Sequence, residues 1–394
     1  MRENEIIIIA KGSGFGYSHV AANTKCYYIA KTLKSYGLNV IVLSSIFYQK
    51  QSIKEKLGKY RGIKYYSPSV HARTSSNLLL SYYKLMHIWK VASFLLYLRN
   101  RKTKVRLIFD DNSTPIPLLI ILQWLGVVEL IFNIEEWPMA HDIPYRQKLW
   151  SHMFATLAMS KCKKIICVSS YLIEQARICN NKAKLFKLPA LAQFDEQKAE
   201  ASPGEGAPYD VARFLYCGNV GYSQVIFNII EAYENMCSMQ EIGRVDLRLI
   251  LHGNARQYQE VSAYVKQSKH SITLMTSLSE ADLSIEFSKA TALLAPLRST
   301  VQDEARFPQK IAEYVVHAKP IITNCVGDIT LYFGLEKNAL IAKDFSTNEL
   351  TKKMNFVVDN RLEARDIGVR GNLVGRKYFD YNQYIVTLGE FVLS

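Results

Sequence analysis

Short apolar runs alternate with helical stretches along most of this chain, in the order expected of a layered α/β protein. The run at 5–10 is followed by a glycine loop at 11–17, a helical pattern from about 20 to 36 and a second run at 39–45. Strand, glycine loop, helix and strand form the opening of a doubly wound parallel sheet. Three further strands are predicted in this half, at 107–111, 129–136 and 163–170.

The pattern breaks at 193–210, a polar stretch in which Pro and Gly cluster, and this predicts a linker. The alternation then restarts. Strands are predicted at 213–218, 246–253, 271–275, 290–297 and 320–324, and helices near 224–239, 256–268, 308–318 and 346–358. We therefore predict an α/β protein with two Rossmann-like, doubly wound parallel-sheet domains facing a cleft, with ligands at the carboxyl ends of the strands.

Chain length and the linker set the expected domain boundaries. A chain of 394 residues favours two domains over one. We expect an N-terminal domain at 1–192, the linker at 193–210 and a C-terminal domain at 211–375. The tail at 376–394 also has a helical pattern, and we expect it to pack back on the N-terminal domain.

Positive charge is concentrated at 47–107, which holds fourteen Lys and Arg but one acidic residue, Glu55, with aromatic residues interleaved. Such a surface suits an anionic membrane leaflet, although a basic surface over buried aromatic side chains is an equal alternative. Polar positions from Ser81 to Ser93 recur every three residues, so their stripe drifts around a helix and predicts no clean amphipathic face. No nucleic-acid-binding motif is present, and nucleic acid is not an expected partner.

The cysteines favour a cytoplasmic protein. They are seven in number and scattered, and no His stands at metal-ligand spacing beside the closest pair, Cys162 and Cys167. This pattern indicates reduced thiols instead of a disulfide framework or a zinc site. The first apolar run is too short for a signal peptide, and no segment offers about twenty uninterrupted apolar residues. We expect a cytoplasmic protein that is peripheral on the cytoplasmic face of the membrane if the basic region binds lipid.

The stretch at 304–323, EARFPQKIAEYVVHAKPIIT, combines features of a phosphate site with a carboxylate. Pro308 fits the first position of a helix, where its missing N–H costs nothing. The bare N–H groups at a helix start favour an anion, and Arg306 and Lys310 add positive charge beside them. Glu313 follows one turn later, and ribose hydroxyls donate well to carboxylates. The stretch therefore predicts a nucleotide site.

The glycine loop does not fit the usual dinucleotide pattern. It reads Gly12-x-Gly14-x-Gly16, and no acid ends the second predicted strand. No P-loop and no nucleophile-elbow motif is present either. A glycine turn at the first strand-to-helix corner still lets a ligand approach the backbone, and a tight turn without a ligand is the alternative.

The order and spacing of several segments resemble the GT-B glycosyltransferases, and most of all glycosyltransferase family 4. The resemblance covers nearly the whole chain and is strongest in the last of its segments, which is similar to the family's Pro-x-Lys-x-x-Glu-Tyr helix followed by a Lys-Pro strand. The segments are KGSGFGY (11–17), FNIEEWP (132–138), KKIICVSSYL (163–172), RFLYCGNVG (213–221), LRLILHG (247–253) and RFPQKIAEYVVHAKPIIT (306–323).

The resemblance implies a UDP- or GDP-sugar donor that is bound mainly by the C-terminal domain. Glu313 would hold the ribose hydroxyls, and the helix start at 306–310 would bind the diphosphate. No metal is expected, because positive side chains would neutralise the leaving diphosphate. The donor-binding residues that we predict are Gly14, Gly16, Gly218, Arg298, Arg306, Lys310 and Glu313.

The acceptor is expected near the glycine loop and the segment that contains Glu135 and Glu136. Either carboxylate could take the acceptor hydroxyl's proton or orient that hydroxyl, and a cap or salt bridge is the alternative. In a retaining member of the family the leaving phosphate itself assists the hydroxyl, so no protein nucleophile is required. We expect a retaining transfer to a lipid-linked or glycan acceptor in bacterial surface polysaccharide biosynthesis.

Two departures from the family pattern leave alternatives open. The family's paired glutamates lie eight residues apart, but the partner position of Glu313 holds Ala305. A Lys or Arg expected soon after Gly218 is also missing, and the next one is Arg244. The alternatives are a degenerate GT-B binding or partner subunit without activity, and a GT-B nucleotide-sugar epimerase.

Overall fold

The chain divides into two compact units, and neither is one continuous stretch. The N-terminal unit contains Met1–Leu191, Ala305–Gln309 and Tyr381–Ser394, and the C-terminal unit contains Ala192–Glu304 and Lys310–Asp380. The structure is a computed structural model. It describes residues 5–11, 15, 21–44, 46–48, 57–67, 70–72, 77–110, 116–140, 144–194, 211–239, 245–276, 278–334 and 337–394.

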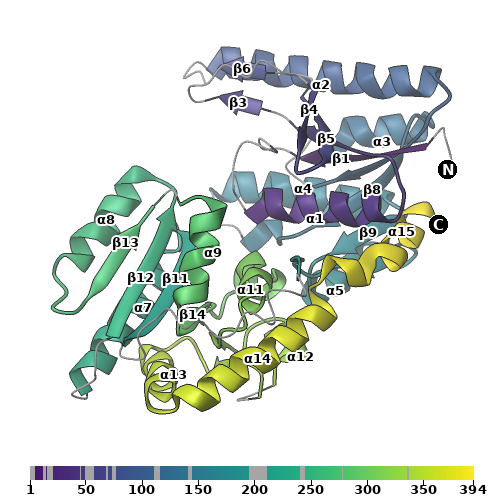
Figure 1. Cartoon of the computed structure of the whole chain (residues 1–394). Helices are drawn as coiled ribbons and strands as arrows, with labels where there is room; N and C mark the ends of the chain where they lie inside the picture. Colours follow the sequence, from purple (N-terminus) through teal and green to yellow (C-terminus); the bar gives the residue numbers. More distant parts are fainter. Residues whose placement is uncertain are drawn as a thin grey trace. The chain divides into compact units, whose positions relative to one another are not determined.

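An eight-stranded sheet forms the centre of the N-terminal unit (Figure 1). All neighbouring strands are parallel except the antiparallel pair β4 and β5 at one edge. A separate parallel pair is formed by β3 (Ile46–Tyr48) and β6 (Val70–Ala72). The order of the main sheet is β10 (Lys184–Lys187), β9 (Lys164–Cys167), β8 (Glu129–Ile134), β7 (Lys104–Phe109), β1 (Glu5–Lys11), β2 (Val40–Ser44), β5 (Ile63–Tyr66) and β4 (Leu57–Tyr60).

Helices cover both faces of this sheet because right-handed crossovers run outward from β1 in two directions. One face carries α1 (Ala21–Ser35), which packs against the C-terminal helix α15 (Ile385–Leu393) and the 3₁₀ turn η2 (Tyr381–Tyr384). The helices of the opposite face are α2 (Asn77–Asn100), α3 (Ile116–Trp124), α4 (Tyr145–Lys161) and α5 (Ser170–Cys179), with the 3₁₀ turn η1 (Pro138–Ala140) before α4.

The C-terminal unit contains a second, six-stranded parallel sheet. Its order is β13 (Ile272–Met275), β12 (Val245–His252), β11 (Ala212–Asn219), β14 (Ala292–Leu294), β15 (Ile321–Asn324) and β16 (Leu340–Ala342). Its helices are α7 (Ser223–Met239), α8 (Ala255–Val265), α9 (Glu280–Lys289), α10 (Val301–Ala305), α11 (Gln309–Val315), α12 (Ile329–Tyr332), α13 (Thr347–Asp359) and α14 (Arg361–Tyr378), with α10 and α11 running across the boundary between the units.

Both sheets have the Rossmann-like strand order, which confirms the predicted fold class. The predicted strands and helices are present, with ends shifted by a few residues. Sequence analysis missed several elements, which are the strands β3, β4, β5, β6, β10 and β16 and the helices α4, α9, α10, α12 and α14. Most of the predicted linker lies outside the described residues. Among the described helices, none is long and apolar enough to cross a membrane.

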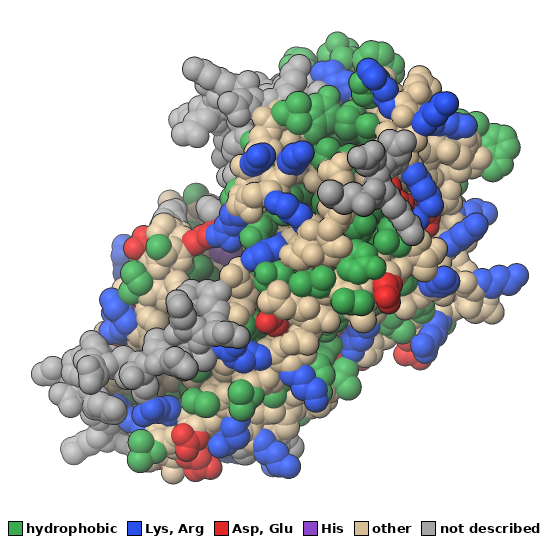
Figure 2. Space-filling model, turned by 45° about the vertical axis from the view of Figure 1, so that its right-hand side comes forward, with side chains coloured by type: hydrophobic (Ala, Val, Ile, Leu, Met, Phe, Trp, Pro, Cys, Tyr) green, Lys and Arg blue, Asp and Glu red, His purple; other side chains and the backbone are tan. Residues whose placement is uncertain are grey.

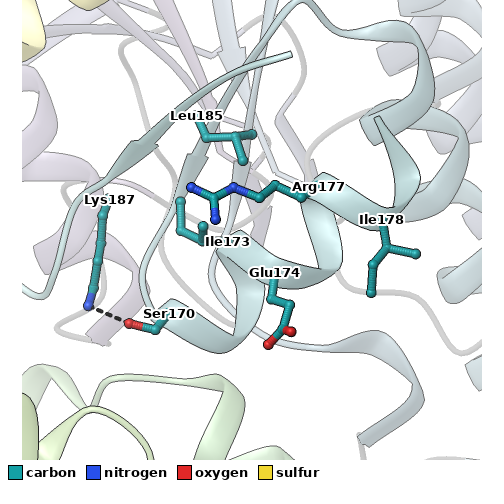
Figure 3. Close-up of a pocket in the computed structure, with 7 residues that line it drawn as sticks. All are labelled: Ser170, Ile173, Glu174, Arg177, Ile178, Leu185 and Lys187. Atoms are coloured by element: carbon teal, nitrogen blue, oxygen red, sulfur yellow. Dashed lines mark hydrogen bonds between the residues drawn. The ribbon is translucent and has the colours of Figure 1, made fainter. Parts of the chain in front are cut away.

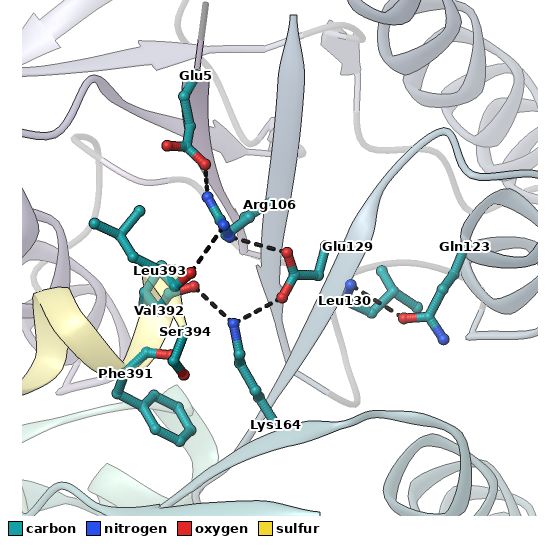
Figure 4. A network of polar contacts seen from close by, with 10 residues as sticks. All are labelled: Glu5, Arg106, Gln123, Glu129, Leu130, Lys164, Phe391, Val392, Leu393 and Ser394. Atoms are coloured by element: carbon teal, nitrogen blue, oxygen red, sulfur yellow. Dashed lines mark hydrogen bonds and ion pairs between the residues drawn. The ribbon is translucent and has the colours of Figure 1, made fainter. Parts of the chain in front are cut away.

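A buried charge network joins the sheet of the N-terminal unit to α15 (Figure 4). Arg106 forms ion pairs with Glu5 and with Glu129, whose Oε2 lies 2.9 Å from Nε. Lys164 Nζ lies 2.7 Å from the other oxygen of Glu129. The two cations also donate to the last carbonyls of α15, Lys164 to Val392 at 2.9 Å and Arg106 to Leu393 at 3.0 Å. Positive charge at a helix C-terminus is favourable, so the network fixes α15 on the sheet.

The network also sets the ionisation of Glu129. Burial alone would raise the pKa of Glu129, but the hydrogen bond from Lys164 and the charges of Lys164, Arg106 and Lys104 outweigh it and lower the pKa below its usual value. A lowered folded-state pKa contributes stability above the unfolded-state pKa, and this contribution is lost as pH falls through the folded-state value. The network is therefore stable at neutral pH and sensitive to acid.

Replacing Lys164 with Met should weaken the N-terminal unit. The substitution keeps most of the side-chain volume but leaves Glu129 and the Val392 carbonyl without their shared donor. We expect urea unfolding of the full chain to show a loss of about 1.5–3 kcal/mol. Lys161→Met, at the exposed end of α4, is the matched control and should change stability by less than about 0.5 kcal/mol. Equal effects of the two substitutions would contradict this role of the network.

Candidate functional site

The switch point of the C-terminal sheet lies between β11 and β14, where the strand order reverses. Ligands of such sheets bind outside the carboxyl ends of the strands at this point. The loop after β11 carries Tyr222 and the loop after β14 carries Arg298, and the Arg298 guanidinium carbon lies 5.4 Å from the centre of the Tyr222 ring. The two loops that border the switch point are therefore in contact.

Arg298, a predicted donor ligand, is held mainly by the protein itself. Its Nε lies 2.9 Å from Oδ2 of Asp303, and its backbone N–H donates to the same oxygen at 2.8 Å. Its terminal nitrogen donates to Gln302 at 2.8 Å. Asp303 is 1% exposed, so this pair is largely shielded from solvent and fixes the loop after β14. Donor binding by Arg298 stays a prediction.

Lys310 and Glu313, the main predicted donor residues, both lie on α11 beside the carboxyl end of β11. The Lys310 ammonium lies 4.1 Å from the centre of the buried Tyr216 ring, a cation–π distance. Burial raises the pKa of Cys217 to about 12, with Lys310 lowering it and Glu313 raising it. The two residues are three positions apart on α11, so their side chains lie on neighbouring turns of the same helix face, near the end of this strand.

Tyr314 anchors α11 to β11. Its phenol oxygen accepts a hydrogen bond of 2.9 Å from the backbone N–H of Cys217, and the side chain is fully buried. Burial is the main cause that raises the pKa of Tyr314 far above its usual value, so the phenol stays neutral. Sequence analysis assigned Tyr314 no role, although it directly follows Glu313 in the motif. The anchor fixes the position of both predicted donor residues.

His252 is a functional candidate that sequence analysis missed. It ends β12 and pairs in register with Asn219 at the end of β11. Partial burial and the nearby Lys310 ammonium lower the pKa of His252, so its imidazole is neutral at pH 7 although part of it meets solvent. The available signal was its place at the carboxyl end of a predicted strand.

Gly218 has a structural explanation. A Cβ at this position would lie 2.5 Å from the phenol oxygen of Tyr216, which lies on the same side of β11. The glycine therefore makes room for the Tyr216 ring that lies under Lys310. Contact between Gly218 and a donor stays a prediction.

Arg306 is assigned to the N-terminal unit, whereas Lys310 and Glu313 belong to the C-terminal unit. Ala305, at the partner position of Glu313, is fully buried, and its carbonyl accepts a hydrogen bond from the Ser169 hydroxyl. The structure thus brings Lys310 and Glu313 together in one unit and groups Arg306 with the other.

Glu135 lies in a small hollow of the N-terminal unit. Its Oε1 accepts a 3.0 Å hydrogen bond from the Asn133 amide, and its Oε2 lies 3.6 Å from Lys25 Nζ. Apolar side chains line the rest of the hollow, among them Ile29, Val168, Leu188, Pro189 and Leu191. Glu136 is half-buried beside it. Gly14 and Gly16 of the glycine loop lie outside the described residues.

A second hollow on the N-terminal unit contains none of the predicted site residues (Figure 3). It lies between α5 and β10, and Lys187 Nζ donates to the Ser170 hydroxyl at 2.8 Å across its edge. Among the residues that the structure describes, no group of three or more His, Cys, Asp or Glu side chains is arranged to hold a metal ion. Metal independence stays a prediction.

Tyr314→Phe should loosen α11 while keeping the core volume. The change leaves the buried N–H of Cys217 without its acceptor, which costs about 1–3 kcal/mol. Thermal unfolding of the full chain should show a lower melting temperature. Tyr264→Phe, on the partly exposed end of α8, is the matched control and should unfold like the wild type. An unchanged melting temperature for Tyr314→Phe would show that the hydrogen bond does not hold α11.

Comparison with known proteins shows the fold. No family model matches the chain, and no curated protein matches it in sequence. It is similar to the structure of a sucrose-phosphate synthase from Thermosynechococcus elongatus, with a TM-score of 0.76, 13% identity and 98% of each chain covered. It is also similar to the structure of an α,α-trehalose-phosphate synthase (UDP-forming) from Burkholderia xenovorans in complex with glucose-6-phosphate. The TM-score is 0.68 at 11% identity, with 99% of this chain and 100% of that chain covered.

A third solved structure, Anabaena HepE in complex with UDP and glucose, gives a TM-score of 0.63 at 10% identity, with 98% of each chain covered. At these identities the likeness extends to the fold and no further. The predicted GT-B fold, with its two Rossmann-like parallel-sheet units, is confirmed.

Proposed function

We propose that this chain is a glycosyltransferase that moves a sugar from a UDP- or GDP-sugar to a hydroxyl of a lipid-linked or glycan acceptor. One observation carries the proposal. Lys310 and Glu313 lie on one face of α11, which Tyr314 fixes at the carboxyl end of β11 beside the switch point of the C-terminal sheet. A cation for a diphosphate and a carboxylate for ribose hydroxyls are the two groups that a nucleotide donor needs.

The similar structures support the proposal by what their names state. One is a UDP-forming synthase with bound glucose-6-phosphate, and another holds UDP and glucose. We therefore assign the nucleotide to the C-terminal unit, with Glu313 on the ribose and Lys310 on the diphosphate. Arg298 and Arg306 are further candidates for the phosphates.

The proposed transfer is retaining and needs no metal. The bond between the anomeric carbon and the diphosphate oxygen breaks, and the acceptor hydroxyl oxygen forms a new bond to the same face of that carbon. The hydroxyl proton passes to the departing phosphate. Lys310 stabilises the negative charge that develops on the leaving group, as preorganised cations do at other phosphate sites.

The acceptor candidates are in the N-terminal unit. Glu135 is held by Asn133 and Lys25, and Glu136 follows it. A carboxylate fixed in this way suits the orientation of an acceptor hydroxyl. The free cysteines accord with a cytoplasmic setting, and we place the reaction in bacterial surface polysaccharide biosynthesis.

Ala305 favours one second candidate function. The buried methyl group leaves no carboxylate at this position for the donor sugar, as expected of a degenerate binding subunit. Donor turnover separates the two. A transferase cleaves a nucleotide-sugar, whereas a binding subunit does not, and an epimerase would change the donor without any acceptor.

Glu313→Ala should weaken the binding of the donor's nucleotide. Isothermal titration with UDP and with GDP should show binding of one of them by the wild type. The variant should bind it about 10–100-fold more weakly, because a hydrogen bond to a charged group is lost. Glu363→Ala, an exposed carboxylate on α14, is the matched control and should bind like the wild type. Full donor use by Glu313→Ala would show that the site assignment is wrong.

Glu135→Gln should slow transfer without changing donor affinity. The amide keeps the size of the side chain but removes the charge that orients the acceptor hydroxyl, and we expect kcat/KM for the acceptor to fall about 10–100-fold. Glu174→Gln, an exposed carboxylate on α5, should leave transfer unchanged. A fall of about 10⁴-fold would indicate instead that Glu135 is the general base, and no fall would remove it from the acceptor site.

A further inference from the structure

The helices α2, α3 and α4 expose an unusual number of large apolar side chains. Trp89 on α2, Trp124 on α3 and Trp150 on α4 are 64%, 84% and 58% exposed, and Leu85 and Tyr82 of α2 are also more than half exposed. A surface helix of a globular protein typically turns a polar face to the solvent. Because α2 is apolar over most of its circumference, it buries one side against the sheet and still presents apolar residues outward.

These three helices form one surface. They cover the same face of the N-terminal sheet (Figure 1), and α3 packs directly against α4. The end of α2 is joined to the end of α3 because the Arg99 guanidinium donates to the backbone carbonyl of Leu125. The exposed Trp124 therefore stands beside the basic end of α2. We call this the α2–α4 surface.

The charge of the α2–α4 surface has one sign. The three helices contain six Lys and Arg and no Asp or Glu. The turn after α2 adds the exposed Arg101 and Lys102, and Arg101 lies 5.4 Å from the centre of the Tyr97 ring. Figure 2 shows the top of the N-terminal unit, where α2 lies, with hydrophobic and basic side chains interspersed.

We propose that the α2–α4 surface docks the protein on an anionic lipid bilayer. Tryptophan and tyrosine prefer the headgroup level of a membrane, where an apolar ring and a polar edge are both satisfied. Each Lys or Arg near such a surface adds attraction to anionic headgroups. A peripheral surface of this kind needs no spanning helix, because its apolar side chains enter only the boundary between headgroups and acyl chains.

Charge favours a membrane over a second copy of the chain. Two α2–α4 surfaces facing each other would bring like charges together without any carboxylate to compensate them. Anionic headgroups compensate them directly. The surface combines apolar rings with uniform positive charge, and an anionic bilayer offers partners for both.

Docking on a bilayer would favour one of the two proposed acceptor classes, an inference that rests on the proposed function. A protein held at a bilayer meets lipid-linked hydroxyls at high local concentration, so it favours a lipid-linked acceptor over a free glycan. The docking itself does not depend on catalysis. Glu313→Ala should therefore bind the nucleotide more weakly and bind vesicles like the wild type, which separates a failure of one proposal from a failure of the other.

Vesicle flotation of the full chain tests the proposal. The protein should float with phosphatidylglycerol vesicles and not with phosphatidylcholine vesicles. Flotation with phosphatidylglycerol should be weaker in roughly 0.5 M salt than in roughly 0.05 M salt, because salt screens the attraction between the charges. Tryptophan emission should shift to the blue on binding. Trp89→Ser with Trp124→Ser, and separately Arg101→Glu with Lys102→Glu, should each lower partitioning at least about tenfold. All four positions are exposed, so the variants should fold, as circular dichroism would verify.

The matched control is Leu362→Ser with Leu373→Ser. Both leucines are exposed on α14 of the C-terminal unit, at 74% and 61%, and the double variant should float like the wild type. Wild-type protein that ignores phosphatidylglycerol vesicles, or surface variants that float like the wild type, would overturn the proposal. A dimer in sedimentation that Trp89→Ser with Trp124→Ser dissociates, without vesicle binding, would assign the α2–α4 surface to self-association instead.

Discussion

Two cations in the sheet of the N-terminal unit depend on the last helix of the chain. Arg106 on β7 and Lys164 on β9 are buried, and each forms an ion pair with one carboxylate oxygen of Glu129. Each of the two cations also donates a hydrogen bond to a backbone carbonyl at the end of α15. A buried charge that loses a partner is strongly destabilising, so the sheet and α15 stabilise each other. The helix end supplies acceptors that water would otherwise have to supply in the core.

In the C-terminal unit a neutral side chain, Tyr314, provides the acceptor for a buried polar group. Tyr314 crosses from α11 to the backbone of β11 and keeps the N–H of Cys217 satisfied. The same contact sets the height of Lys310 over Tyr216 and the place of Glu313 one turn away. The positions of Lys310 and Glu313 thus depend on the buried phenol of Tyr314. This phenol is neutral, so it does not compete with a ligand for either charged side chain.

Sequence analysis succeeded where local patterns decide the structure. Apolar runs predicted five neighbouring strands in each of the two sheets, and the motif around Glu313 predicted the helix that places it. It failed where contacts between segments that are distant in the sequence decide the structure. The helix α14 contains Gly368, which argues against a helix by propensity, but a Cβ there would lie 2.6 Å from the carbonyl oxygen of Ala318. The glycine is needed for close packing, which no local pattern reveals.

The same limit applies to the candidate site. Lys310 and Glu313 could be predicted because they share one helical stretch. His252 could not be paired with them, since its position follows from the register of β12 against β11. The exposure of Trp89 and Trp124 also depends on which side of each helix meets the sheet. Helices that are apolar nearly all round leave that choice to tertiary packing.

The return of the chain to the N-terminal unit has a consequence for its synthesis. A ribosome releases the strands β7 and β9 long before it makes residues 385–393, yet Arg106 and Lys164 find their last acceptors only there. Everything that the C-terminal sheet needs is made by residue 380. The N-terminal sheet therefore cannot complete its packing until residues 385–393 have left the ribosome, although most of its strands are made in the first half of synthesis.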